Sequence, residues 1–132
     1  MMNELSKINN GELISLVHPD FEIDLPQPYE RDIFLFESHI AGTSYIEEIL
    51  DLNDKINFET ELNFFREIDN PYDKKAIMIK LKTGEKIGYV PKADNVVFSR
   101  LMDAGKNLFG KVQDKELVGN WLKIYIKIYL KE

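Results

Sequence analysis

The segment from residue 66 to residue 92 limits the possible folds most strongly. It reads REIDNPYDKKAIMIKLKTGEKIGYVPK and contains two short apolar segments separated by Thr83 and Gly84. Two such segments around a glycine-containing turn are typical of a β-hairpin. The DNPYD sequence ahead of them predicts a turn, because proline presets one turn angle and Asp and Asn side chains bond neighbouring backbone amides. We therefore expect antiparallel strands beside a turn rich in polar and aromatic groups.

The rest of the chain adds further short strands and little helix. Ser44 and Glu47 have capping-box spacing and predict a short helix over 44–52, and a second helix is expected over 91–103, capped by Asp94 or Asn95. The strands do not alternate with helices as in a parallel α/β fold, so we expect a mainly β fold, a small six-stranded barrel with two or three short helices. The six strands are expected at residues 32–43, 56–67, 76–81, 85–90, 108–113 and 121–130.

The chain is expected to have two parts. Its 132 residues suffice for one domain with its own core. Residues 1–30 are predicted to form a helical or extended acidic leader, and residues 31–132 the barrel. The leader carries six acidic residues against one lysine, whereas residues 64–92 carry seven basic and four acidic residues. The net charge of −6 therefore resides mainly in the leader, and the barrel keeps a mildly basic region that suits a polyanion.

The composition and the hydropathy pattern argue against thiol chemistry, a signal peptide and a membrane helix. Cysteine is absent, which excludes disulfide and thiolate chemistry and indicates a reducing, cytoplasmic environment. The N-terminus has no basic region followed by an apolar one, so no signal peptide is predicted. No apolar segment approaches the roughly 20 residues of a membrane helix, so no membrane partner is expected.

Catalytic groups are sparse. The two histidines, His18 and His39, fall in different segments, and neither a P-loop nor a G-x-G-x-x-G sequence is present, so no metal or cofactor is predicted. Asp69 and Asp73 beside two lysines are compatible with a magnesium-dependent nuclease. Turn formation alone explains the same aspartates, and no complete catalytic set can be assembled. We therefore expect a protein without enzymatic activity.

Binding of nucleic acid is better supported. Several tyrosines fall at or beside predicted turns, with basic residues near them. Single-strand binders on small barrels stack bases on aromatic rings and hold phosphates with cations. An alternative is that the aromatic residues fill the core and the lysines cover an ordinary surface. The residues in question are Tyr45, Tyr72, Tyr89, Arg66, Lys74 and Lys92.

These residues lie in segments that resemble the HIRAN domain. This module is attached to the helicase-like transcription factor and to related fork-remodelling ATPases, and it also occurs in stand-alone bacterial proteins. The similarity covers most of residues 32–130 and is most specific where an Asn-Pro-Tyr-Asp turn is followed by Ala-Ile and then by Gly-Tyr-Val-Pro. The matching segments are IAGT at 40–43, REIDNPYDKKAI at 66–77 and GYVPK at 88–92.

The resemblance implies a modified OB-like barrel that binds single-stranded DNA and, in eukaryotic members, a free 3′ end. It places Asn70, Tyr72 and Asp73 in the end pocket, with Tyr72 stacked on the terminal base and Asp73 accepting a bond from the 3′ hydroxyl. Lys92 matches a phosphate-contacting lysine. Tyr89 takes a place that histidine occupies elsewhere, and Tyr45 an aromatic position after the first strand. The eukaryotic pocket has an arginine near that aromatic residue, where this chain has threonine and serine.

The sequence thus predicts a non-catalytic module that binds single-stranded DNA, with a free 3′-hydroxyl end as its ligand, in DNA repair or replication processing. Two alternatives stay open. One is a protein-interaction module that uses the surface of residues 66–92 or the acidic leader, and the other is the metal-dependent nuclease. The predicted DNA-binding residues are Tyr45, Arg66, Asn70, Tyr72, Asp73, Lys74, Tyr89 and Lys92.

Overall fold

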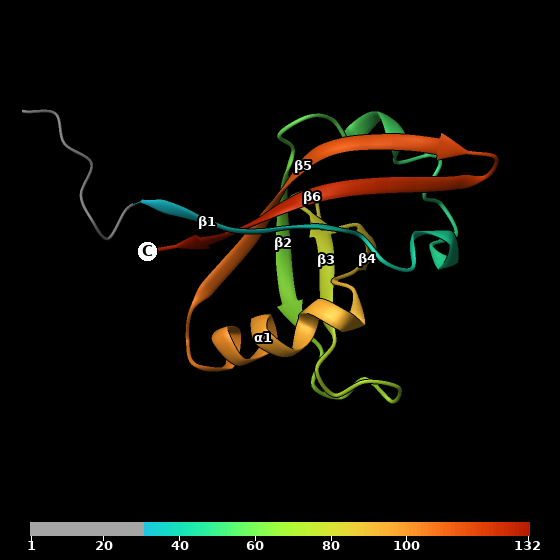
Figure 1. The fold of residues 1–132 in the computed structure, drawn as a ribbon. Helices are drawn as coiled ribbons and strands as arrows, with labels where there is room; N and C mark the ends of the chain where they lie inside the picture. Colours follow the sequence, from blue (N-terminus) through green and yellow to red (C-terminus); the bar gives the residue numbers. More distant parts are fainter. Residues whose placement is uncertain (1–30) are drawn as a thin grey trace, which may run out of the picture.

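The computed structural model describes residues 31–132, and the predictions for the leader lie outside this range. Six antiparallel strands form one curled sheet in the order β1-β6-β5-β2-β3-β4 (Figure 1). This confirms the predicted six-stranded, mainly β fold. The strands are β1 (Asp32–His39), β2 (Glu61–Arg66), β3 (Ile77–Leu81), β4 (Lys86–Tyr89), β5 (Asn107–Val118) and β6 (Trp121–Lys131).

One backbone bridge draws the two edges of the sheet together. Ala41, just after β1, pairs with Tyr89 at the end of β4, and the two residues exchange N–H···O bonds of 2.8 and 2.9 Å. Gly88 permits this approach, because a Cβ atom there would lie 2.6 Å from the Ala41 carbonyl oxygen. The chain after β1 is thereby held against β4, at the opposite edge of the curled sheet.

The core follows from the alternation of β6. Leu122, Ile124, Ile126 and Ile128 are each at most 1% exposed and point into the curl of the sheet. Burial of each such side chain contributes about 1.5–3 kcal/mol. The residues between them, including Lys123 and Lys127, lie on the other face and are partly exposed. The outer face of the sheet is therefore lined by polar and aromatic side chains.

The predicted helix over 44–52 is wrong. Two short 3-10 helices, η3 (Thr43–Tyr45) and η4 (Asn53–Lys55), flank turns instead. Gly42, at φ 76°, takes the capping position without a side-chain bond, and Ile46 adopts an extended conformation that stops helix growth. The buried Thr43 hydroxyl donates to the Leu122 carbonyl oxygen at 2.7 Å, so a contact with β6 fixes this segment.

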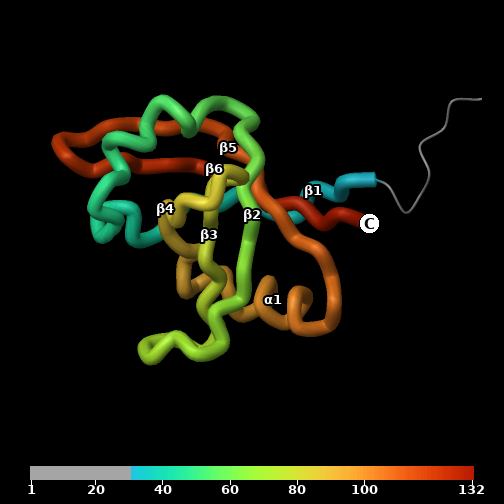
Figure 2. The backbone as a smooth tube through the Cα atoms, turned by 180° about the vertical axis from the view of Figure 1, so that it is seen from behind, coloured from blue at the N-terminus to red at the C-terminus, as the bar shows by residue number. Residues whose placement is uncertain are grey.

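The helix α1 (Lys92–Asp103) is confirmed, but its cap is Pro91, and neither Asp94 nor Asn95 fills that position. It lies across the end of the sheet where β2 finishes (Figures 1 and 2). Three strand boundaries also differ by more than one residue: β1 ends at residue 39, β2 begins at residue 61, and β5 extends to residue 118. The later start of β2 follows from a turn, in which Glu59 has φ 67° and Phe58 is 72% exposed. No helix of residues 31–132 is long and apolar enough to cross a membrane.

Candidate functional site

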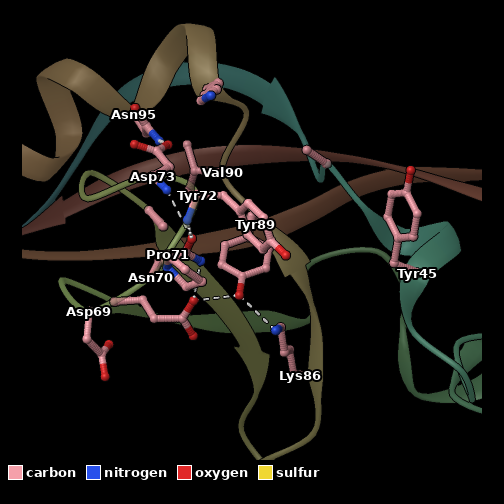
Figure 3. Close-up of a pocket in the computed structure, with 14 residues that line it drawn as sticks. Tyr45, Asp69, Asn70, Pro71, Tyr72, Asp73, Lys86, Tyr89, Val90 and Asn95 are labelled. Atoms are coloured by element: carbon pink, nitrogen blue, oxygen red, sulfur yellow. Dashed lines mark hydrogen bonds between the residues drawn. The ribbon is translucent and has the colours of Figure 1, made fainter.

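A cavity of about 850 Å³ opens between the 69–73 turn, the end of β4 and the start of α1 (Figure 3). This volume falls within the range of about 300–1,000 Å³ that is usual for ligand sites. We call it the turn pocket. It is lined by Ala41, Tyr45, Glu67, Asp69, Asn70, Pro71, Tyr72, Asp73, Ala76, Lys86, Tyr89, Val90, Lys92 and Asn95.

The structure brings six of the eight predicted site residues to this cavity. They come from segments up to 47 positions apart, which meet because the bridge at Ala41 holds the chain after β1 beside β4. Figure 3 shows Tyr45 standing apart from the turn residues, with Tyr89 between them. The six residues are Tyr45, Asn70, Tyr72, Asp73, Tyr89 and Lys92.

The turn is built by its own side chains, as the sequence indicated. The Asn70 Oδ1 atom accepts bonds from the backbone N–H groups of Tyr72 at 2.8 Å and Asp73 at 3.0 Å. Asp73 Oδ1 accepts a bond from the Lys75 N–H at 2.9 Å. Side-chain oxygens thus satisfy the amides that would otherwise lack partners in so tight a turn. As a result the Tyr72 side chain projects outward and is 89% exposed.

A polar network ties the turn to β4. Glu67 Oε1 accepts bonds from the Tyr89 hydroxyl and from Asn70 Nδ2, both at 2.6 Å. Lys86 Nζ in turn donates to the Tyr89 hydroxyl at 2.8 Å (Figure 3). The Tyr89 and Asn70 bonds, with the nearby charge of Lys86, hold the pKa of Glu67 below its usual value, so that its carboxylate is ionised at neutral pH.

Asp73 is fixed between the turn and α1. Its Oδ2 atom accepts a bond from Asn95 Nδ2 at 2.8 Å, and Asn95 is only 2% exposed. The pKa of Asp73 is lowered by the Lys75 backbone N–H, by Asn95, and by the charges of Lys92 and Lys75. A rigid carboxylate, ionised at neutral pH, therefore stands in the pocket wall, with the exposed Lys92 close by.

Glu67, Lys86 and Asn95 were not among the predicted site residues. Glu67 lies within the matching segment 66–77, which is the only sequence signal that points to it. Lys86 and Tyr89 are three residues apart, and regular strand alternation would place them on opposite faces. An irregularity in the β3–β4 pairing, where Lys80 pairs with Lys86 and Ile79 with Gly88, brings both to the same face. The sequence alone does not reveal that irregularity.

Arg66 and Lys74 lie outside the lining of the turn pocket. The Arg66 guanidinium donates to both carboxylate oxygens of Asp103, at 2.8 and 3.1 Å, and to the Ala76 carbonyl oxygen at 3.0 Å. Its nitrogens thus connect the end of β2 to the end of α1. The side chain of Arg66 is only 15% exposed, which fits this structural role. Lys74 is exposed beside the turn.

Metal ligands do not gather in the part of the chain that the structure covers. Within residues 31–132, no three carboxylate or histidine side chains lie close enough to hold a metal ion. Ser38 and His39 do not form a catalytic pair, since the Ser38 hydroxyl donates to the Asp94 carboxylate at 2.8 Å. The walls of the turn pocket combine aromatic, anionic and cationic side chains.

Comparison with known proteins decides the family. The model of the HIRAN domain matches residues 33–132, which is most of the chain and includes every residue of the turn pocket. The chain belongs to the HIRAN domain family. A search of curated proteins found no match.

Two solved structures share the fold of this HIRAN domain. One is the crystal structure of a protein from Lactobacillus plantarum, with a TM-score of 0.71 and 22% identity, covering 76% of this chain and 95% of that chain. The other is the crystal structure of the HIRAN domain of human HLTF, with a TM-score of 0.58 and 20% identity, covering 76% of this chain and 81% of that chain. These similarities establish the fold.

The lowered pKa of Glu67 gives this HIRAN domain a testable pH dependence. A carboxyl group whose pKa is lowered by folding stabilises the protein above its unfolded pKa, near 4.5, and loses that effect as the pH falls through the folded pKa. Glu67→Gln should therefore lower the free energy of unfolding by about 0.5–1.5 kcal/mol at pH 7, the usual range for one hydrogen bond. At pH 3 the free energies of unfolding of the variant and the wild type should differ less.

Urea unfolding followed by circular dichroism at the two pH values measures this difference. Asp69→Asn is the matched control, because it removes an exposed carboxylate at the same turn. It should change the unfolding free energy little at either pH. If Glu67→Gln lowers the free energy of unfolding as much at pH 3 as at pH 7, the charge of Glu67 contributes nothing to stability.

Proposed function

We propose that this protein binds single-stranded DNA in the turn pocket and holds a free 3′-hydroxyl end there. HIRAN domains are DNA-binding modules, so family membership supports nucleic-acid binding in general. The observation that carries the proposal is the pocket itself, which combines two protruding tyrosines, a fixed carboxylate and an exposed lysine. A role in DNA repair or replication processing, without catalysis and in the cytoplasm, belongs to the same proposal.

The two tyrosines at the pocket fit a role in base stacking. Tyr45 and Tyr72 are both 89% exposed, although each carries a large apolar ring. A ring held so far into solvent by a rigid turn offers its face to a ligand. Stacking on every base type is a general property of aromatic side chains in single-strand binders. We propose that Tyr72 stacks on the terminal base and that Tyr45 contacts a neighbouring nucleotide.

Asp73 supplies the proposed selectivity for a hydroxyl end. It is ionised at neutral pH and anchored through Lys75 and Asn95, so it accepts a hydrogen bond from a 3′ hydroxyl without first reorganising. A 3′ phosphate would instead place two negative charges together, which is unfavourable even when solvent screens them. Lys92 begins α1, where its ammonium and the helix dipole both favour the phosphate between the last two nucleotides.

Fluorescence anisotropy with ten-nucleotide strands labelled at the 5′ end tests the proposal. A strand with a 3′ hydroxyl should bind about tenfold more tightly than one with a 3′ phosphate, the ratio that 1.4 kcal/mol produces. Asp73→Asn should reduce this preference, because the repulsive charge is gone. Equal affinities of the wild type for the two strands would overturn end recognition.

The same titrations separate the alternative functions. Binding through phosphates weakens as salt rises, by about 0.7 in the logarithm of the binding constant per contact for each tenfold increase in salt. An apolar protein contact would respond far less, so affinity for strands that does not change with salt would favour a protein partner. Cleavage of the strand that requires magnesium and is lost in Asp73→Asn would favour the nuclease.

A further inference from the structure

Lysines and aromatic rings also gather outside the turn pocket, on the outer face of the sheet. In residues 31–132, lysine ammonium groups lie over aromatic rings in six contacts, with Nζ-to-centroid distances of 4.5–5.6 Å. One of them, Lys86 over Tyr89, belongs to the turn pocket, and the other five lie outside it. All six lie on strands. The outer face thus places cations beside aromatic rings at several points.

The strand register aligns part of this face into a single row across all six strands. Each residue of the row is the direct partner of the next on the neighbouring strand, so their side chains project from the same face. The last residue, Lys86, also lines the turn pocket. The cross-strand row consists of Phe34, Tyr129, Phe109, Asn63, Lys80 and Lys86.

The rings at the far end of the cross-strand row form a continuous aromatic surface. Phe109 stacks on Tyr129 with centroids 5.4 Å apart and planes at 17°, and Phe34 meets Tyr129 edge-on at 5.8 Å. Phe34 remains 50% exposed, and Phe65, which lies beside the row, is 43% exposed. These rings therefore offer apolar area to a ligand on a face that otherwise points to solvent.

Three lysines beside these rings form no salt bridge among the described residues, although Glu61 and Glu37 lie directly opposite Lys111 and Lys127 in the strand register. Lys80 lies over Phe65 at 5.2 Å, Lys111 over Tyr129 at 5.1 Å and Lys127 over Phe34 at 5.6 Å. The ion pairs found in residues 31–132 involve other basic residues. Each ammonium can therefore turn from its ring toward a phosphate without breaking a salt bridge.

We propose that the cross-strand row is the path along which a bound single strand leaves the turn pocket toward its 5′ side. This inference rests on the proposed function, because it takes the 3′ end to be in the pocket. Bases would stack on the exposed rings, while Lys80, Lys111 and Lys127 would contact phosphates. Five strand spacings of about 4.8 Å make the path about 24 Å long. That length suits the 4–16 nucleotides that single barrels of this type accommodate.

Two strands of oligothymidine with free 3′ hydroxyls, of 3 and 15 nucleotides, test the path. The short strand reaches only the pocket, so the wild type should bind the long strand more tightly and with a steeper salt dependence. The triple variant Lys80→Gln/Lys111→Gln/Lys127→Gln should lose more than half of the additional affinity that the wild type shows for the long strand, and stacking on the rings should supply the rest. For the long strand, the slope of the logarithm of the binding constant against the logarithm of the salt concentration should become less steep by about 2. This is about 0.7 for each lost phosphate contact.

A matched control keeps the net charge of the triple variant but removes lysines elsewhere. Lys55→Gln/Lys106→Gln/Lys123→Gln changes three lysines that neither belong to the row nor flank it on a strand, of which Lys123 lies on β6 over Trp121. It should retain at least half of the gain in affinity that the wild type shows for the long strand. Phe34→Ser tests stacking independently of charge and should weaken binding of the long strand at least fivefold, with binding of the short strand unchanged.

The outcomes distinguish the path from the pocket. Equal wild-type affinities for the two lengths, or an equal loss in the control triple variant, would overturn the path while leaving the pocket proposal intact. Loss of short-strand binding in the Lys80/Lys111/Lys127 variant would also contradict the path, because these lysines should not touch a ligand confined to the pocket. Absence of binding to both strands by the wild type would overturn the proposed function itself.

Discussion

Gly88→Ala is expected to lower the free energy of unfolding by about 2–5 kcal/mol. An alanine Cβ would clash with Ile40 Cγ2 and would lie 2.6 Å from the Ala41 carbonyl oxygen. That oxygen accepts the 2.9 Å bond from the Tyr89 N–H, so it cannot retreat without breaking the bridge between the sheet edges. Overpacking of this kind costs about 1–3 kcal/mol, and the backbone conformation, at φ 155°, adds a cost of similar size.

Urea unfolding followed by circular dichroism measures the loss, and Gly84→Ala is the matched control. Gly84 also has a positive φ, of 104°, but a Cβ there would meet no atom within 4 Å. Both variants should suffer backbone strain, whereas only the change at Gly88 should disturb the bridge. Gly88→Ala should therefore be less stable than Gly84→Ala by about 1–3 kcal/mol. Equal losses would mean that the close approach at Ala41 contributes nothing to stability.

This bridge connects folding to the candidate site. Ala41 and Tyr89 both line the turn pocket, and Tyr45 reaches it only because the chain after β1 is held against β4. A substitution that opens the bridge should displace Tyr45 from Tyr72 even if the 69–73 turn stays intact. The turn is built from local contacts, while the pocket around it depends on a contact between distant segments.

The parts of the site that the sequence predicted depend on local chemistry. The 69–73 turn was predicted from its proline and its Asp and Asn residues, and Asn70 and Asp73 do bond the backbone amides that follow them. The six strands were predicted because alternation in segments such as β6 records which face is buried. Local signals of this kind involve residues that lie a few positions apart, so they remain visible in the sequence.

The sequence does not show which distant partner a side chain takes. The guanidinium of Arg66, whose contact with DNA stays a prediction, is bonded to Asp103, 37 positions later. Asn95 was expected to cap α1, and its amide instead holds Asp73 across the pocket. The capping-box spacing of Ser44 and Glu47 was overridden by the contact of Thr43 with β6. None of these partners can be identified from spacing along the chain.

Tyr72→Ala is expected to weaken binding of a strand with a 3′ hydroxyl by about 1–3 kcal/mol, or roughly 5- to 150-fold. This is the range for the loss of one base–aromatic stack. The ring is 89% exposed, and the turn is held by bonds from Asn70 to the backbone, so the fold should be unaffected. The measurement is anisotropy with the ten-nucleotide strand, accompanied by thermal unfolding to verify that stability is retained.

Phe58→Ala provides the control for Tyr72→Ala, since Phe58 is 72% exposed but lies outside the turn pocket. It should leave affinity unchanged. Tyr72→Phe should bind nearly as well as the wild type, because stacking requires the ring and no hydrogen bond of the Tyr72 hydroxyl is found among the described residues. A loss of affinity in Tyr72→Phe as large as that in Tyr72→Ala would mean that the Tyr72 hydroxyl makes the contact and that ring stacking does not. Unchanged affinity in Tyr72→Ala would show that the turn is not part of the binding site, because Tyr72 is its highly exposed aromatic residue.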